Sequence, residues 1–432
     1  MPLNYRNIKQ PCAIIVGLDS VQGLQAARVL AQRNVPVIAI AKDAQYHSCR
    51  TKVCKKIIFA NTENEELIET LKDLGPRLSQ KAVIFPCQDN NVLNISRHRH
   101  QIEKWYHIAL PSHDVVEMLM HKASFCEFAQ KEGLPIPRTF VLKTRVDAET
   151  AAQEFDYPCI LKPSIRNPNW LQQTSLKGFK VANADQLLDV YDRCETLAEV
   201  LIAQEWIEGA DTNHYTCHCY FDASSNPIVT FTSNKLRQWP PKTGQRCLGQ
   251  ECRNDIVMEE TVRLYRSVNY RGLAYLEMKR DERSGKYFIV EPNVGRPTGS
   301  STTAEASGVE ILYTMYCDSA GLPLPTNIKQ QYRGVKWIHL LRDVQASFYY
   351  WRHRDLTVKE WWQSLRGRKT YALFSWRDPA PFLSALRKSI GIMLSPTARQ
   401  LGSVTPLPKD VKPQKSFEAE KAEIKIINRN LI

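Results

Sequence analysis

Short apolar runs alternate with helical patterns over the first hundred residues of the chain. The apolar runs lie at residues 13–16, 35–40, 56–60 and 82–85, and a helical pattern spans residues 65–74. Strand-like runs that alternate with helices indicate a parallel sheet with helices on both faces, the doubly wound α/β arrangement. The chain therefore begins with a predicted α/β domain.

Two glycines flank the turn that follows the first apolar run. Gly17 and Gly23 enclose five residues, whereas a dinucleotide-binding turn has the spacing G-x-G-x-x-G. A dinucleotide site therefore has weak support. We expect these glycines to allow close packing of the first strand on the next helix.

The pattern changes near residue 120. Helical patterns at residues 112–120 and 122–132 end at Gly133-Leu-Pro-Ile-Pro137, because proline cannot continue a helix. Strand-like runs then predominate, interrupted by one helical pattern at 184–194, and they lie at residues 140–142, 159–162, 200–206, 228–232, 274–278 and 287–290. Further helices are predicted near 358–365 and 381–390. We expect five units, at residues 1–120, 121–210, 211–330, 331–400 and 401–432, the last a polar tail with little pattern.

The most informative stretch is a predicted hairpin with its turn at residues 281–285. Glu277 lies on the first strand, and Glu291 and Asn293 lie at the end of the second, two residues apart and so on one face. Carboxylate and amide oxygens suit Mg²⁺, which takes one or two carboxylates and substrate phosphates. Arg296 follows and could stabilise charge on a transferred phosphoryl group. The alternative is a solvated hairpin, but the interleaved apolar residues favour burial, and buried carboxylates need partners.

Two lysines lie at positions from which they could bind a phosphate. Lys162 ends the apolar run 159–162, although a lysine there could also simply enter solvent. Lys122 begins a helix, where the helix dipole disfavours a cation unless an anion is bound.

A third segment, Gln204-Glu-Trp-Ile207, continues into a turn with Gly209 and Asp211. Its backbone could meet an adenine edge, and its carboxylate could meet a ribose hydroxyl. The alternative is an ordinary strand end followed by turn acids.

In this order the segments resemble the ATP-grasp superfamily, over about residues 10–325. The Glu-x-Asn ending is the most specific motif. Asn234-Lys-Leu-Arg237 with the following Trp-Pro-Pro…Gly244 further resembles predicted carboxylate–amine ligases of the D-aspartate ligase type. Its alternative reading is a basic surface loop. The resemblance implies a mixed α/β and α+β chain. A pre-ATP-grasp doubly wound domain would precede a two-lobed ATP-grasp fold and a basic, Trp-rich C-terminal appendage.

The resemblance also implies roles for particular residues. The phosphates of ATP would be held by Lys122 and Lys162, the adenine by Gln204, Glu205, Trp206 and Ile207, and the ribose by Asp211. Two Mg²⁺ ions (or Mn²⁺) would be held by Glu277, Glu291 and Asn293. Arg296 and Arg237 would act in catalysis, and Lys235 and Asp89 would meet substrate, although Asp89 could equally cap a helix. One departure is the segment 164–180, which has only Gly178 where many relatives have a glycine-rich loop, with Lys177 and Lys180 beside it.

The implied reaction activates a carboxylate as an acyl phosphate and joins it to an amine, releasing ADP and phosphate. Two alternatives remain: a bicarbonate-using carboxylase of the same fold, and a nucleotide-sensing or polyanion- and membrane-binding module without turnover. The acceptor would be a small molecule or a group linked to the cell envelope or a polysaccharide. An oligomer is compatible with the sequence.

The net charge of +13 is concentrated near the end of the chain. Residues 331–400 hold 13 Lys and Arg against 4 Asp and Glu, a net charge of +9, and 5 of the 9 tryptophans. Such a segment either packs on the catalytic domains or contacts an anionic membrane or polyanion, and nucleic acid is not expected. No run approaches the roughly 20 apolar residues of a membrane span, and no export signal precedes the 12 cysteines. The expected location is cytoplasmic, with a membrane-peripheral alternative, and reduced thiols are expected, without paired zinc spacing.

Overall fold

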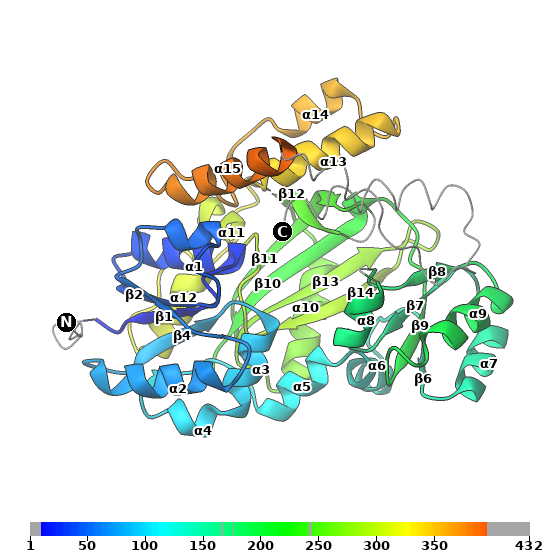
Figure 1. Cartoon of the computed structure of the whole chain (residues 1–432), viewed down its shortest axis with the longest axis horizontal. Helices are drawn as coiled ribbons and strands as arrows, with labels where there is room; N and C mark the ends of the chain where they lie inside the picture. The colour runs from blue at the N-terminus through cyan, green and yellow to red at the C-terminus, as the bar shows by residue number, and fades with distance from the viewer. Residues whose placement is uncertain (1–9, 166, 175, 242–243, 395–432) are drawn as a thin grey trace.

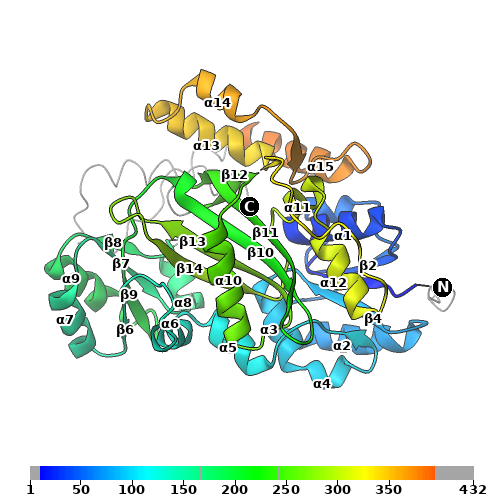
Figure 2. The ribbon, with the colours of Figure 1, turned by 180° about the vertical axis from the view of Figure 1, so that it is seen from behind.

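The computed structural model describes residues 10–394 except 166, 175, 242 and 243, so the predicted tail at 401–432 lies outside the described residues. Figures 1 and 2 show an N-terminal domain at one end, a small lobe at the other and a large sheet between them. Helices α13, α14 and α15 form a separate layer along one edge. The mixed α/β and α+β architecture agrees with the prediction.

The N-terminal domain is a parallel sheet of strand order β3-β2-β1-β4-β5. Its strands are β1 (Ala13–Val16), β2 (Val37–Ala41), β3 (Lys56–Phe59), β4 (Ala82–Pro86) and β5 (Tyr106–His107), and its main helices are α1 (Val21–Gln32), α2 (Glu65–Leu74) and α3 (Asp89–Arg97). Alternate residues of β1 enter two different hydrophobic cores, Ile14 one and Ile15 the other. Both faces of the sheet are therefore covered, which confirms the doubly wound prediction.

The glycines after β1 have the predicted packing role. A Cβ atom on Gly23 would lie 2.3 Å from the carbonyl oxygen of Gly17, so no other residue fits there without a shift. Ser20 caps α1, and its hydroxyl accepts a hydrogen bond of 3.0 Å from the amide of Gly23. The strand and helix are thereby held close together.

The small lobe is an antiparallel sheet of order β6-β9-β7-β8. It follows helices α5 (His113–Met120) and α6 (Lys122–Lys131), and it consists of β6 (Thr139–Leu142), α7 (Arg145–Glu154), β7 (Cys159–Pro163), α8 (Pro168–Gln173), β8 (Phe179–Val181), α9 (Ala184–Cys194) and β9 (Leu201–Glu205). Leu161 and Ala203 enter the core that the strands share with α7 and α9. Their neighbours Lys162 and Gln204 point to the opposite face, because side chains alternate along a strand.

The large sheet has the order β14-β13-β10-β11-β12-β15-β16 and is antiparallel except between β15 and β16. Its strands are β10 (His214–Phe221), β11 (Pro227–Trp239), β12 (Gln245–Glu251), β13 (Gly272–Arg280), β14 (Tyr287–Val294), β15 (Lys336–Ile338) and β16 (Lys369–Tyr371), and α10 (Asp255–Ser267), α11 (Thr302–Ser307) and α12 (Ile311–Ser319) belong to this part of the chain. The segment from Asn234 to Trp239 continues β11 and is not a surface loop. β15 and β16 come from the basic segment, which therefore extends the large sheet.

The N-terminal domain and the large sheet share a continuous core. Gly272, at the start of β13, has a φ of +104°, and a Cβ atom there would lie 2.0 Å from the carbonyl oxygen of Ala109. Gly295, just after β14, would bring a Cβ within 2.2 Å of Leu110. These close approaches fix the start of β13 and the end of β14 against the N-terminal domain.

The C-terminal appendage consists of α13 (Leu340–Arg352), α14 (Val358–Ser364) and α15 (Ala380–Leu394). It is attached through buried ion pairs. Arg28 of α1 lies 2.9 Å from the carboxylate of Asp378 and also donates to the carbonyl of Leu373. Part of the appendage is therefore packed against the other domains, which was one of the two alternatives for the basic segment. No helix among the described residues is long and apolar enough to cross a membrane.

Candidate active site

The polar face of the large sheet is set by strand register. Glu277 of β13 lies directly opposite Glu291 of β14, and Tyr275 lies opposite Asn293. Directly opposed residues of an antiparallel pair have Cβ atoms about 5 Å apart on the same face. The predicted metal ligands Glu277, Glu291 and Asn293 are therefore brought together, while Leu276, between Tyr275 and Glu277, enters the core on the other face.

Glu277 is surrounded by cations. The ammonium of Lys235, on β11, lies 3.5 Å from its carboxylate, and the lysine is 7% exposed. Burial alone would raise the pKa of Glu277, but Lys235, with His214, Arg246 and Lys177, lowers it to about 2. Glu277 is thus ionised throughout the physiological pH range. Lys235, a predicted substrate contact, lies beside the predicted metal ligands.

Arg246 of β12 is a site residue that sequence reasoning missed. Its guanidinium donates hydrogen bonds to the hydroxyls of Ser233 (2.9 Å), Thr216 (2.8 Å) and Ser300 (3.2 Å). Burial lowers its pKa, and its partners are neutral hydroxyls, while Glu277 lies close enough to raise the pKa. Strand alternation was the available signal, but without the strand pairing it could not place this arginine on the face of Glu277.

Two histidines of β10, also missed, lie on the same face. Burial, above all, lowers the pKa of His218 to about 3 and holds the pKa of His214 well below its usual range, so both rings are neutral. Neither Nε2 of His218 nor Nδ1 of His214 has a hydrogen-bond partner among the described residues. His218 stacks on Tyr275, with ring centroids 5.8 Å apart.

The small lobe contributes Lys162. Its ammonium donates to Oε1 of Gln204 at 2.8 Å, and Nε2 of Gln204 donates to the hydroxyl of Thr139 at 2.8 Å. Both ends of the Gln204 amide are therefore engaged, and this predicted adenine contact positions Lys162. Burial, with Lys122 and Lys177 adding to it, lowers the pKa of Lys162 to about 8.

The charge of Glu291, on β14 of the large sheet, acts on Lys162 of the small lobe. It opposes the lowering of the Lys162 pKa that burial causes. Glu291 itself is exposed. Lys122, the first residue of α6, lies 3.5 Å from the carbonyl oxygen of Ser164, directly after β7, and so stands beside Lys162.

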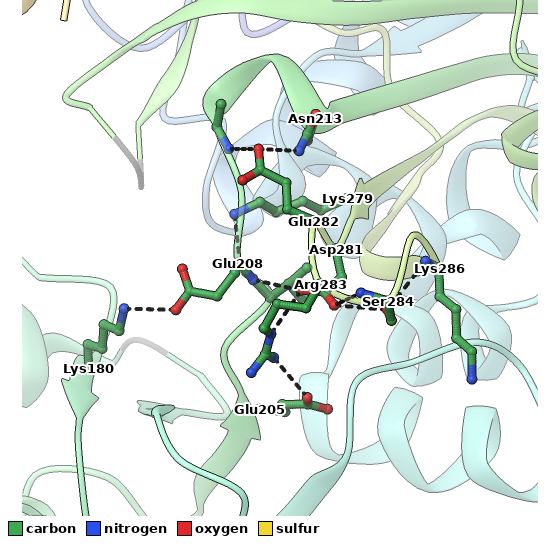
Figure 3. Close-up of polar contacts among 12 residues, drawn as sticks. Lys180, Glu205, Glu208, Asn213, Lys279, Asp281, Glu282, Arg283, Ser284 and Lys286 are labelled. Atoms are coloured by element: carbon green, nitrogen blue, oxygen red, sulfur yellow. Dashed lines mark hydrogen bonds and ion pairs between the residues drawn. The ribbon is translucent and has the colours of Figure 1, made fainter.

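The linker between the two lobes, residues 206–210, is held by the hairpin turn between β13 and β14 (Figure 3). Lys279 donates to the carbonyl of Ile207 at 2.8 Å, and Asp281 accepts from the amide of Glu208 at 3.1 Å. Glu282 accepts from the amide of Ala210 at 3.0 Å. The backbone of this predicted adenine-binding segment is thereby fixed relative to the metal-ligand strands.

Side chains of the same region form outer contacts. Glu205 pairs with Arg283 at 3.4 Å, and the ammonium of Lys180 lies 4.5 Å from the ring centroid of Trp206. Lys180 also pairs with Glu208 at 3.4 Å. Glu205, Trp206 and Ile207 thus lie together at the junction of the lobes, as the sequence order required.

Asp211, the predicted ribose ligand, already has two partners. It accepts a hydrogen bond of 2.6 Å from Gln238 of β11 and another from the hydroxyl of Tyr350 on α13. Burial first, and then Asp211, raises the pKa of Tyr350, so the phenol keeps its proton. The C-terminal appendage therefore reaches the residue that sequence reasoning assigned to nucleotide binding.

Arg237, which is predicted to act in catalysis, is bound by residues of the appendage. Its guanidinium pairs with both carboxylate oxygens of Asp343 on α13, at 2.8 and 3.1 Å, and donates to Ser364 at 2.8 Å. The Arg237 and Asp343 side chains are 6% and 0% exposed. All three nitrogens are engaged, so Arg237 attaches the appendage to β11.

Arg296 lies beside the metal-ligand strands, and it donates to Oδ1 of Asn293 at 2.8 Å, to the hydroxyl of Tyr275 and to the carboxylate of Asp89. Burial alone would lower its pKa, but Tyr275 and Asp89 raise it. Asp89 is the first residue of α3, and its pairing with Arg296 joins the N-terminal domain to the site. Its carboxylate meets a cation of the protein, where a helix cap or a substrate contact was expected.

The arrangement is suited to a polyanion and a divalent cation together. Lys162, Lys235 and Arg246 are held around the face that carries Glu277 and Glu291. Among the described residues, no group of three or more His, Cys, Asp and Glu side chains forms a complete metal site. Two carboxylates and an amide oxygen would therefore need phosphate oxygens or water to complete an octahedral Mg²⁺ shell.

Comparison with known proteins gives distant relatives, and no family model matches the chain. D-aspartate ligase of Enterococcus faecium is 21% identical over 239 residues, which cover 53% of this chain and 57% of that protein. D-alanine–D-alanine ligase of Pseudomonas fluorescens is 24% identical over 168 residues, which cover 37% of this chain and 49% of that protein. The chain thus spans about half the length of the curated relatives it matches.

Solved structures of similar shape cover more of the chain. N5-carboxyaminoimidazole synthetase from Staphylococcus aureus superimposes with a TM-score of 0.58 at 15% identity, over 76% of this chain and 82% of that one. The biotin carboxylase domain of 2-oxoglutarate carboxylase from Hydrogenobacter thermophilus, solved with MgADP and bicarbonate, gives a TM-score of 0.60 at 17% identity, over 75% and 73%. At these identities the likeness shows a shared fold.

Proposed function

We propose that this chain, which has the ATP-grasp fold of those enzymes, is an ATP-dependent ligase that joins a carboxylate to an amine. The observation that carries the proposal is that Glu277 and Glu291 lie opposite each other, with the charges of Lys235 from the large sheet and Lys162 from the small lobe acting on them. The named relatives are ligases of D-aspartate and D-alanine, which supports the same class of reaction.

The chemistry explains why such a site needs many charges and few nucleophiles. A carboxylate is a poor electrophile because oxide is a poor leaving group. Its oxygen attacks the γ-phosphorus of ATP, ADP leaves, and an acyl phosphate forms. The amine nitrogen then attacks the acyl carbon, phosphate leaves, and the nitrogen loses a proton. Phosphoryl transfer needs mainly positioning and charge neutralisation.

The residues that would hold ATP come from both lobes. Lys162 and Lys122 would hold the phosphates. Burial first, and then Lys122 and Lys177, lower the pKa of Lys162, and a bound phosphate would favour its charged form. The backbone of residues 205–207, at the end of β9 and the start of the linker, would contact the adenine. Asp211 would receive the ribose hydroxyls in exchange for its hydrogen bonds to Gln238 and Tyr350.

The metal would be held on β13 and β14. Glu277, Glu291 and Asn293 fit Mg²⁺ or Mn²⁺, because all three are hard oxygen ligands and the first stays ionised, with a pKa of about 2. When bound, the metal would neutralise phosphate charge. Lys235 would then exchange its contact with Glu277 for a phosphate oxygen, and Arg296 keeps its positive charge for the phosphoryl group or the acyl phosphate.

Arg246 completes the proposed site. Its hydroxyl partners Ser233, Thr216 and Ser300 orient the guanidinium without neutralising it. A guanidinium binds a carboxylate or a phosphate in bidentate fashion. We assign it to the substrate carboxylate or to the acyl phosphate that replaces it.

The acceptor is proposed to be the amine of an amino acid, either free or carried by a cell-envelope or polysaccharide precursor. The D-amino acids in the names of the relatives support the first part of this assignment. A second candidate reaction uses bicarbonate in place of the carboxylate, and the biotin carboxylase domain holds bicarbonate in its solved structure. Both reactions begin with phosphorylation by ATP.

A substrate screen tests the proposal. ADP release would be measured with a panel of carboxylates and amino acids, with and without bicarbonate, and amide products would be detected by mass. The proposal expects ADP release that needs both a carboxylate and an amine. Bicarbonate-dependent ADP release without an amine would favour the carboxylase. ATP binding without ADP release on any acceptor would overturn the ligase assignment in favour of a nucleotide sensor.

A further inference from the structure

Helix α13 has apolar residues on two sides. Leu340, Val344, Phe348 and Trp351 are spaced four, four and three residues apart, which places them on one stripe of the helix. Their exposed fractions are 37%, 50%, 55% and 53%. The other side of α13, with Ala346 among its residues, is buried against the protein. The outward stripe is therefore not needed for attaching α13.

The other two helices of the appendage also carry exposed apolar residues. On α14, Val358 and Trp362 are 65% and 61% exposed, and Leu383 and Ile390 on α15 are 57% and 47% exposed. Trp376, in the loop before α15, is 87% exposed. Figures 1 and 2 show that α13, α14 and α15 together form the outermost layer on their side of the molecule. Monomeric proteins rarely leave so many large apolar side chains exposed in one layer.

Exposed cations outnumber exposed acidic residues on this layer. Asp343 and Asp378 are buried and bound to Arg237 and Arg28. Asp355 is exposed, and so is Glu360, which accepts hydrogen bonds from the amide and hydroxyl of Thr357 in a capping box. The exposed cations of the layer are Arg352, Arg354, Lys359, Arg366, Arg368, Arg377, Arg387 and Lys388. The layer therefore faces outward with tryptophan and positive charge.

This combination matches an anionic lipid surface better than other partners. Tryptophan sits at the headgroup level of a bilayer, and lysine and arginine bind anionic headgroups while their aliphatic stems stay near apolar atoms. A second copy of the same surface would oppose cations to cations. Stacking on nucleic-acid bases uses aromatic rings, but many of the exposed apolar residues of this surface are aliphatic: Leu340, Val344, Val358, Leu383 and Ile390.

We propose that the outward surface of α13, α14 and α15 docks the protein on an anionic membrane. Docking goes beyond the proposed ligase reaction and does not depend on it. The expected mode is peripheral, with exposed tryptophans at the interface and the active-site lobes on the side away from the lipid.

Vesicle co-sedimentation of the full chain tests the proposal. Vesicles of phosphatidylcholine alone would be compared with vesicles containing about one third phosphatidylglycerol, at low and high salt. We expect binding to the anionic vesicles, weakened by salt, and little binding to phosphatidylcholine. Each cation near the surface contributes about 1 kcal/mol, which is about a fivefold change in affinity, so R366Q/R368Q should bind about 25-fold more weakly.

A second pair of variants tests the contribution of the exposed apolar residues to vesicle binding. W362S/W376S should bind anionic vesicles at least tenfold more weakly, whereas I256S, which alters an exposed apolar residue of α10, should bind like the unchanged protein. ATP binding by all variants would be measured in parallel to show that the fold is intact.

Four results would overturn the proposal. Binding to both vesicle types alike would remove the role of charge, and unchanged binding by W362S/W376S would remove the role of this surface. Self-association that the same substitutions abolish, without vesicle binding, would assign the surface to a second copy. Preferential binding of a single-stranded oligonucleotide would assign it to nucleic acid. Because vesicle binding needs no ATP, failure here leaves the ligase proposal standing.

Discussion

The candidate active site and the outer surface of the appendage are both rich in lysine and arginine, but their surroundings differ. In the site, Lys162 and Lys235 have defined partners, Gln204 at 2.8 Å and Glu277 at 3.5 Å. On the appendage, cations such as Arg366 and Arg368 are exposed. Salt screens exposed charges strongly and buried charges weakly. The site can therefore select a ligand by geometry, whereas the surface can respond mainly to summed charge.

Asp343 lies between these two regions. It belongs to the appendage, but its carboxylate is buried and paired with Arg237 of the catalytic sheet. It also accepts a hydrogen bond of 3.1 Å from the indole of Trp361. Substitution of Asp343 should strongly lower the free energy of unfolding, and substitutions in the site should strongly lower turnover. Substitutions among the exposed charges should change stability and turnover little.

The largest effect is expected for Asp343→Ala. Removing one partner of a buried ion pair leaves the other charge unpaired, so the free energy of unfolding should fall by about 3–5 kcal/mol. Urea unfolding followed by tryptophan fluorescence measures it. Asp355→Ala, an exposed acid of the same segment, serves as the control and should change stability by less than about 0.5 kcal/mol. Equal stability of the two variants would contradict the contrast between buried and exposed charge.

Glu291→Gln should come next, with an effect on activity and little on stability. Loss of one charged group of the site should lower ADP formation by about 10²–10³-fold, or 3–4 kcal/mol, by analogy with the loss of an oxyanion donor. Glu291 is exposed, so its neutral isostere leaves the core intact. Glu259→Gln on α10 makes the same chemical change outside the site and should retain full turnover. Normal turnover by Glu291→Gln would remove the metal assignment.

The pH dependence of ATP binding should report on Lys162. Its pKa is lowered to about 8, so the free protein loses this charge as the pH rises through 8. A bound polyphosphate favours the charged form, and binding above pH 8 must therefore take up a proton. The KM for ATP should rise, by up to about tenfold per pH unit above 8. In Lys162→Arg the charge persists, and the slope between pH 8 and 9 should flatten. An identical slope in both proteins would assign the titration to another group.

A smaller effect is expected for Tyr350→Phe. Its hydroxyl bonds to Asp211, which the proposed nucleotide must use. If the ribose replaces this hydrogen bond, its loss should lower the KM for ATP by about two- to twelvefold, with kcat unchanged, because one hydrogen bond contributes about 0.5–1.5 kcal/mol. Titration of ADP by calorimetry measures the binding directly. A raised KM would show instead that Tyr350 positions Asp211 for the nucleotide.

Several features of the site could be predicted from local sequence pattern. The two-residue spacing of Glu291 and Asn293 and the turn between their strand and that of Glu277 are local, so the shared face followed from strand periodicity. The doubly wound sheet followed from alternating strands and helices. Helix α13 was not predicted, although the spacing of Leu340, Val344, Phe348 and Trp351 along one stripe of the helix was an available signal.

The sequence alone determined the order of the segments, the strand faces and the chemistry that each face could offer. Only the tertiary structure decided which side chains of distant segments contact one another. Arg246 lies in the site because β12 pairs with β11, and Arg237 is paired with Asp343, 106 residues further along the chain, because α13 packs on β11. Gln204 faces Lys162 because β7 and β9 are neighbours in the small lobe. Periodicity and turns depend on neighbours along the chain, whereas the choice of a partner depends on which distant segments pack together.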